Sequence, residues 1–246
     1  MSSCTPIRAP FISKQLIQRL VTGDPTPAYV GRISAVFANN GVGVRGDLAA
    51  VVKAILLDPE ARGPAKAASN FGSLKEPVLM VTGLLRALSG VTDGSRLEGQ
   101  TGNLGQRPYY SPTVFNYFPP DNTISGTTVL GPEFAIHTTT NAVGRSNLVY
   151  TLAYGGYAPD TTIADSPGTR LFVAQFEPLA DSAAAMVSQI NKVLAGGQFP
   201  VAQEATIVTA VNAITLSVPP TAQQRTDRAR MAVYLMGSSY DYQVQR

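Results

Sequence analysis

The chain has few of the residues that build disulfides, metal sites and nucleophile–base pairs. Its 246 residues include one cysteine, Cys4, one histidine, His137, and no tryptophan. A lone cysteine excludes an internal disulfide, and one histidine with one cysteine cannot form a His/Cys zinc site. Any metal would need oxygen ligands, so the sequence predicts no metal site, and it predicts no cofactor.

Charged residues are also scarce. Asp, Glu, Lys and Arg make up 14% of the chain, against roughly 25% in ordinary soluble domains. Small polar residues must therefore cover the surface, which favours an extracytoplasmic protein over a cytosolic one. The formal net charge is +3, and basic residues concentrate only around Arg225, Arg228 and Arg230. This distribution predicts no nucleic-acid partner.

Long apolar runs are missing. No run approaches the roughly 20 residues that cross a bilayer, and the N-terminus lacks the pattern of a signal peptide. Residues 1–9 show no periodicity and look like a start joined to a pattern already under way at Pro10. The 44% of hydrophobic residues is ample for a packed core, so we expect a single helical domain over residues 10–246.

Apolar residues at helical spacing predict most of the secondary structure. Thr26 and Asp47 stand where N-caps are preferred, and Ser73 with Glu76 has the spacing of a capping box before Pro77. The predicted fold is mainly α, an irregular multi-helix bundle. The expected helices cover 10–21, 27–39, 48–57, 77–90, 138–154, 182–194, 201–214 and 221–238.

The middle of the chain differs from both flanks. Residues 91–136 are rich in Gly, Pro, Thr and Asn and lack helix or strand periodicity, so they predict a long central loop region between helical subdomains at 10–90 and 137–246. The stretch SPTVFNYFPPD, residues 111–121, combines three aromatic residues with three prolines. Proline restricts the backbone, and we expect Phe115, Tyr117 and Phe118 to anchor this stretch on a core.

Several motifs in a fixed order resemble one known family. PFISKQLIQRLVTGDPTPAYVGRISAVFANNGVGVRGDLAAVVKAILLDPEAR is followed by FGSLKEPVLMVTGLLRAL, SPTVFNYFPPD, GPEFAI and RARMAVYLMGSSYDYQVQR. From about Pro10 to Arg246 the chain looks like the C-terminal half of the DUF1800 family. The resemblance implies a largely helical bacterial protein, usually exported, commonly encoded beside a DUF1501 partner and with no settled reaction. It also implies an upstream half, in a parent that is periplasmic or secreted.

Gly41 to Gly46 spell G-x-G-x-x-G, the pattern of a dinucleotide-binding turn. The residues before it have helical spacing and include Arg32, where a buried parallel strand is required. We therefore interpret the motif as a helix stop followed by a turn to the cap at Asp47.

Candidate catalytic residues gather around the central loop. No G-x-S-x-G elbow occurs, so hydrolysis would have to use Glu133 and Asp121 as a carboxylate pair, with His137 as a further acid or base near a helix start. The alternative is that each of these residues has a structural role. His137 would then form a hydrogen bond at the helix start, and Asp121 would cap a turn. Glu133 would cap the next helix or form a salt bridge with it, for example with Arg145.

The same region carries candidate substrate-binding residues. The faces of Tyr109, Phe115 and Tyr117 could stack on a sugar ring or another flat apolar surface. Arg145, together with Asn147 on the same helix, could bind an anion or a carbonyl, and Asn116 is a further candidate for substrate binding. For Asn116 the sequence favours a structural loop clamp, since a buried amide must be satisfied locally.

Two functions from different classes remain open. The first is a scaffold or partner-binding module that presents residues 91–136 to another protein. The alternative is a hydrolase that acts on a glycan or ester through the carboxylates beside the aromatic loop. If the absence of the upstream half leaves apolar helix faces uncovered, we expect a homodimer to bury those faces.

Overall fold

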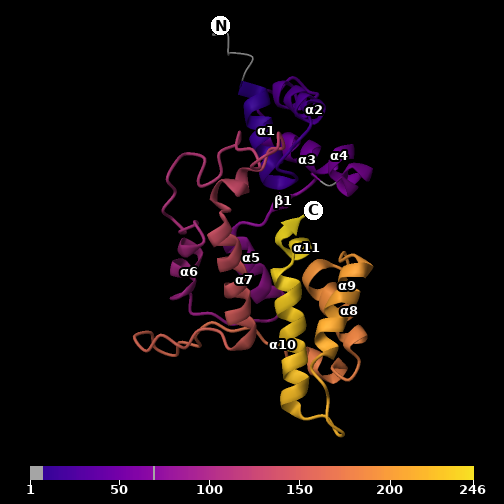
Figure 1. The fold of residues 1–246 in the computed structure, drawn as a ribbon. Coiled ribbons are helices and arrows are strands. Elements are labelled where there is room, and N and C mark those ends of the chain that lie inside the picture. The colour runs from indigo at the N-terminus through magenta and orange to yellow at the C-terminus, as the bar shows by residue number, and fades with distance from the viewer. Residues whose placement is uncertain (1–7, 69) are drawn as a thin grey trace. The chain divides into compact units, whose positions relative to one another are not determined.

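The computed structural model describes residues 8–68 and 70–246 and is mainly α, as the sequence predicted (Figure 1). The non-family start predicted at 1–9 falls largely outside the described residues, as does Cys4. Contacts between Cα atoms group the chain into two compact units. Unit 1 holds residues 8–74, 112–136 and 244–246, and unit 2 holds 75–111 and 137–243. The single domain over residues 10–246 stays a prediction.

Unit 1 begins with the predicted group of three helices, α1 (Arg8–Leu20), α2 (Pro27–Ala38) and α3 (Leu48–Leu57). Thr26 and Asp47 are the N-caps, and their side chains accept hydrogen bonds from the backbone of Tyr29 and Ala50. The Tyr29 hydroxyl donates to the carbonyl of Ile55 at 2.6 Å. A small core unites the three helices, formed by Ile17, Tyr29, Ile33, Val51 and Ile55.

A short antiparallel ladder completes unit 1. Strand β1 (Ser73–Leu74) pairs with β2 (Val244–Gln245), with Ser73 opposite Gln245 and Leu74 opposite Val244. The remaining elements of this unit are α4 (Pro59–Arg62) and the 3-10 helices η1 (Pro64–Ala67) and η2 (Pro132–Ile136). Gly72 has a φ of 107°, and a Cβ there would collide with the carbonyl oxygen of Gln245. Only glycine fits this approach of two backbones.

The capping box predicted at Ser73 and Glu76 was wrong. Ser73 belongs to β1, and Glu76 is itself the N-cap residue of α5 (Pro77–Ala87), with no side-chain cap bond. Proline at the first helical position has a suitable φ and no orphan N–H to cap. The helix therefore begins at Pro77 without the box, while the backbone of Ser73 is used in the ladder.

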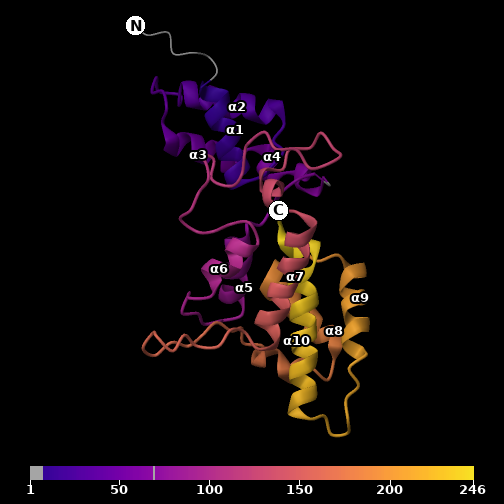
Figure 2. The ribbon, with the colours of Figure 1, turned by 60° about the vertical axis from the view of Figure 1, so that its left-hand side comes forward.

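Unit 2 is a group of helices around α10 (Ala222–Ser238). Helix α10 contacts α7 (Thr139–Tyr154), α8 (Ala183–Ala195), α9 (Val201–Asn212) and the 3-10 helix η3 (Ala174–Leu179). Figures 1 and 2 show α10 alongside α7, with α8 nearby. The unit ends with the short α11 (Tyr240–Gln243). The helix α6 (Leu97–Asn103) was not predicted, because LEGQTGN has two glycines and no apolar period.

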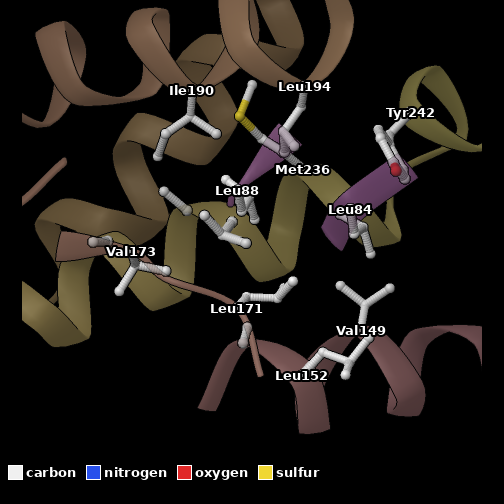
Figure 3. Packing of buried hydrophobic residues seen from close by; sticks show 14 of the residues in the cluster. Leu84, Leu88, Val149, Leu152, Leu171, Val173, Ile190, Leu194, Met236 and Tyr242 are labelled. Carbon is white, nitrogen blue, oxygen red and sulfur yellow. The ribbon is translucent and has the colours of Figure 1, made fainter. Parts of the chain in front are cut away.

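The core of unit 2 draws side chains from α5, α7, α8, α9, α10 and α11 and from η3, and Figure 3 shows part of it. Close helix packing depends on Gly237 of α10, where a Cβ would lie 2.9 Å from a methyl carbon of Val149 on α7. The residues labelled in the figure are Leu84, Leu88, Val149, Leu152, Leu171, Val173, Ile190, Leu194, Met236 and Tyr242. Within the described part of the chain, no helix has both the length and the apolar character that a membrane crossing needs.

Candidate functional site

In unit 1 the proline-rich stretch 112–121 contacts helix α1 through hydrogen bonds and a cation–π interaction. Phe118 is buried, and the Arg19 guanidinium lies 4.9 Å from the centroid of its ring. Arg19 also donates to the carbonyl of Phe118 at 3.2 Å, and the amide of Gln18 donates to the carbonyl of Pro120 at 2.9 Å. The anchoring predicted for Phe118 is confirmed.

The two candidate catalytic carboxylates of unit 1 each contact a cation on α1. Asp121 is exposed and lies 2.6 Å from the ammonium of Lys14, while the buried Glu133 lies 3.4 Å from a guanidinium nitrogen of Arg19. An apolar pocket without cations typically raises the pKa of a carboxyl that acts as a general acid. Here both carboxylates instead form ion pairs that join residues 112–136 to α1. The partner predicted for Glu133, Arg145, was wrong.

The other loop residues named from the sequence form turns and ring contacts. The Phe115 ring meets Phe11 edge-on, with centroids 6.3 Å apart, and the Tyr117 ring lies 6.2 Å from that of Phe118. Asn116 has a φ of 60°, and its carbonyl accepts a hydrogen bond from the Thr113 hydroxyl at 2.9 Å. Asparagine tolerates this left-handed backbone better than most residues, which accounts for its place between the aromatics.

Arg145, in unit 2, is almost fully buried on α7. Its Nε donates to the side-chain oxygen of Gln243 at 2.8 Å, and its Nη2 donates to the carbonyl of Lys75 at 2.6 Å. Burial lowers the pKa of Arg145 to about 10. Its hydrogen bonds tie α7 to α11 and to the segment that leads into α5, so the guanidinium stabilises the fold of unit 2.

Two further bases share the surroundings of Arg145. Burial, followed by the charge of Arg145, lowers the pKa of Lys75 to about 8, and the Lys75 ammonium lies 3.7 Å from the centre of the Tyr242 ring. The pKa of His137 is lowered by the same two causes, which favours the neutral ring. Sequence reasoning missed Lys75, which nothing in the local sequence marks as buried.

A small apolar pocket lies between α5, α6 and the residues after α6 in unit 2. Its volume is about 230 Å³, and Val78, Val81, Leu97, Pro108 and Tyr109 are among its lining residues. Tyr109 is fully exposed and has a φ of 66°. An exposed tyrosine ring beside an apolar hollow offers a partner both an aromatic face and a cavity, which suits a contact surface.

Polar contacts fix the walls of this pocket. The side-chain oxygen of Gln106 accepts a hydrogen bond from the backbone N–H of Val78 at 3.0 Å, and its amide donates to Glu76 at 2.6 Å. Glu98 lines the pocket and forms an ion pair with Arg107. Since that pair balances the charge of Glu98, the pocket is close to neutral.

In the glycine-rich loop between α2 and α3, the backbone amides of residues 41–44 are all hydrogen-bonded within the loop. The side-chain oxygen of Asn39 accepts hydrogen bonds from the N–H groups of Gly41 and Gly43 at 2.9 Å each. Asn40 accepts in the same way from Val42 and Val44, at 3.1 and 3.2 Å. Nucleotide loops direct such amides to the ligand, so this loop is the helix-to-helix turn that the sequence predicted.

The candidate residues divide between the units. Phe115, Asn116, Tyr117, Asp121 and Glu133 belong to unit 1, whereas Tyr109, His137 and Arg145 belong to unit 2. No group of three or more His, Cys, Asp or Glu side chains placed to hold a metal ion occurs in residues 8–68 and 70–246.

A comparison with family sequence models decides the identity of the chain. The model described as "Protein of unknown function (DUF1800)" matches residues 4–244, nearly the whole chain. The chain belongs to the DUF1800 family. The motifs that carried the resemblance in this DUF1800 chain lie inside the matched range, except for the last two residues of the closing motif, Gln245 and Arg246. No curated protein and no solved structure gives a significant match.

Proposed function

We propose that this DUF1800 chain is an extracytoplasmic partner-binding module that receives an apolar side chain of a second protein in the pocket beside Tyr109. The observation that carries the proposal is the combination of a fixed apolar hollow with a fully exposed tyrosine at its edge. Aromatic residues next to pockets dominate the binding energy of many protein interfaces.

The size of the pocket favours a side chain over a cofactor. Sites for small-molecule ligands usually enclose about 300–1,000 Å³, whereas this pocket measures about 230 Å³. Its one charged lining residue, Glu98, is already paired with Arg107. An uncharged apolar side chain is therefore the occupant that the lining accepts without leaving a charge unpaired.

The occupant we propose is a DUF1501-type protein, the partner that the family resemblance implies. The low content of charged residues, 14%, supports a location outside the cytoplasm, in the periplasm or beyond. The alternative of a glycan or ester hydrolase gains no support from the carboxylate contacts, because Asp121 and Glu133 both contact cations of α1.

The test is a binding titration with a DUF1501-type protein. Tyr109→Ser should weaken binding at least fivefold, since truncating an aromatic anchor costs about 1 kcal/mol or more. Thr82→Met, which places extra atoms at the pocket, should also weaken it. The matched control is Tyr240→Ser, another exposed tyrosine of unit 2.

Equal affinity of the Tyr109 and Tyr240 variants would refute the pocket as the contact site. Failure of the unaltered chain to bind the DUF1501-type protein would refute the choice of partner. Turnover of chromogenic glycosides or esters that disappears in Glu133→Gln would instead establish the hydrolase.

A further inference from the structure

A second cavity, in unit 1, has both apolar and cationic lining residues. Its volume is about 470 Å³, within the range of about 300–1,000 Å³ found for small-molecule sites. Leu20, Leu56 and Phe71 supply apolar surface, and Arg62, Lys66 and Arg246 supply cationic side chains. No lining residue carries a side-chain carboxylate.

The charges of Arg62 and Lys66 are not balanced by the acidic residues nearest to them in the sequence. Asp58 and Glu60 both form ion pairs with Arg32, at 2.8 and 2.9 Å. The Nε of Arg62 donates to the carbonyl of Leu56 at 2.7 Å. This bond positions the guanidinium and leaves its charge uncompensated, because the carbonyl is neutral.

The chemistry of the lining selects one class of ligand. We propose that this cavity binds a small amphipathic anion, a free carboxylic acid whose ionised head contacts Arg62 and Lys66 while its apolar body lies on Leu20, Leu56 and Phe71. A guanidinium matches a carboxylate in two-bond geometry, and a lysine adds a point charge. A cationic amphiphile would meet repulsion, and a neutral one would lose the charge interaction.

The cavity is distinct from the pocket of the proposed partner. All of its lining residues belong to unit 1, whereas those of the partner pocket belong to unit 2. The inference therefore does not depend on the proposed function, and each can fail while the other holds.

Calorimetric titration with octanoate, octanol and octylammonium tests the inference. Octanoate should bind, and each of the other two should bind several-fold more weakly. Lys66→Gln and Arg62→Gln should each raise the dissociation constant for octanoate about two- to fivefold, as expected for a partly exposed charge pair. Raising the salt concentration should weaken octanoate binding in the unaltered chain.

Matched controls come from the same unit. Lys53→Gln, which removes an exposed lysine that does not line the cavity, is the control for Lys66→Gln. Leu57→Ser is the control for Leu56→Ser, because both leucines are exposed and only Leu56 lines the cavity. Circular dichroism of every variant establishes that it is folded. Equal loss of binding in Lys53→Gln and Lys66→Gln would overturn the proposal, as would octanol or octylammonium binding as tightly as octanoate. Binding to vesicles of anionic phospholipid without binding of octanoate would overturn it too.

Discussion

Lys75 should make the stability of the protein depend on pH in a way that one substitution removes. Burial and the charge of Arg145 lower the pKa of Lys75 from 10.5 to about 8 in the folded chain. Below about pH 8 the lysine is protonated in both states, and the folded state bears the full cost of burying the charge. Between about pH 8 and 10.5 the unfolded state holds more protons, so the free energy of unfolding rises with pH.

The size of the effect follows from the shift. A difference of about 2.5 pKa units corresponds to about 3 kcal/mol. The ammonium also contacts the Tyr242 ring at 3.7 Å, an attraction of about 0.5–2 kcal/mol that is lost when the lysine gives up its proton. The net gain over the whole interval is therefore about 1–3 kcal/mol.

Urea unfolding followed by circular dichroism, from about pH 7 to about pH 9.5, measures the larger part of this gain while staying below the tyrosine titrations. In Lys75→Met the rise should disappear, because the methionine stem keeps the packing and carries no charge. Lys53→Met, at an exposed lysine, should keep it. The reasoning is refuted if stability is flat in the unaltered chain or rises equally in Lys75→Met.

Three more expectations concern unit 1 and can be measured in the same urea assay. Tyr29→Phe should cost about 1–2 kcal/mol by removing the donor to the Ile55 carbonyl, while Tyr240→Phe, at an exposed ring, should cost almost nothing; equal costs would refute the role of the buried hydroxyl. Gly72→Ala should cost about 1–3 kcal/mol more than Gly126→Ala, because both glycines have positive φ but only Gly72 faces a carbonyl oxygen within collision distance. Burial would raise the pKa of Asp58, yet hydrogen bonds from Arg32 and the Glu60 N–H prevail and lower it. The stability that Asp58 contributes is therefore lost as pH falls through its folded pKa, and Asp58→Asn should flatten that acid loss.

Helix prediction succeeded where local chemistry determined the ends. Thr26, Asp47, Thr138, Ser182 and Thr221 all accept a backbone hydrogen bond at the first turn of a helix. Such caps act within three residues along the chain, so they can be found without knowing any tertiary contact. The stop at Gly196 is local as well, with a φ of 61°.

The missed features depend on residues far apart in the sequence. Strands of two residues show no periodicity, so the pairing of Ser73 with Gln245 leaves no pattern to recognise. The burial of Lys75 depends on Tyr242 and Arg145, and the partner of Glu133 is Arg19 of α1. Of the candidate site, the aromatic composition of the central segment could be predicted, whereas its ion pairs and both cavities could not.

The course of the chain through the two units constrains how the protein can be dissected. The backbone leaves unit 1 after residue 74, returns for 112–136, leaves again and returns for 244–246. No single uninterrupted gene segment therefore encodes either unit in full. During synthesis, β1 cannot pair until residues 244–245, which form β2, have also emerged from the ribosome. Fragments cut at apparent linkers should therefore yield incomplete units.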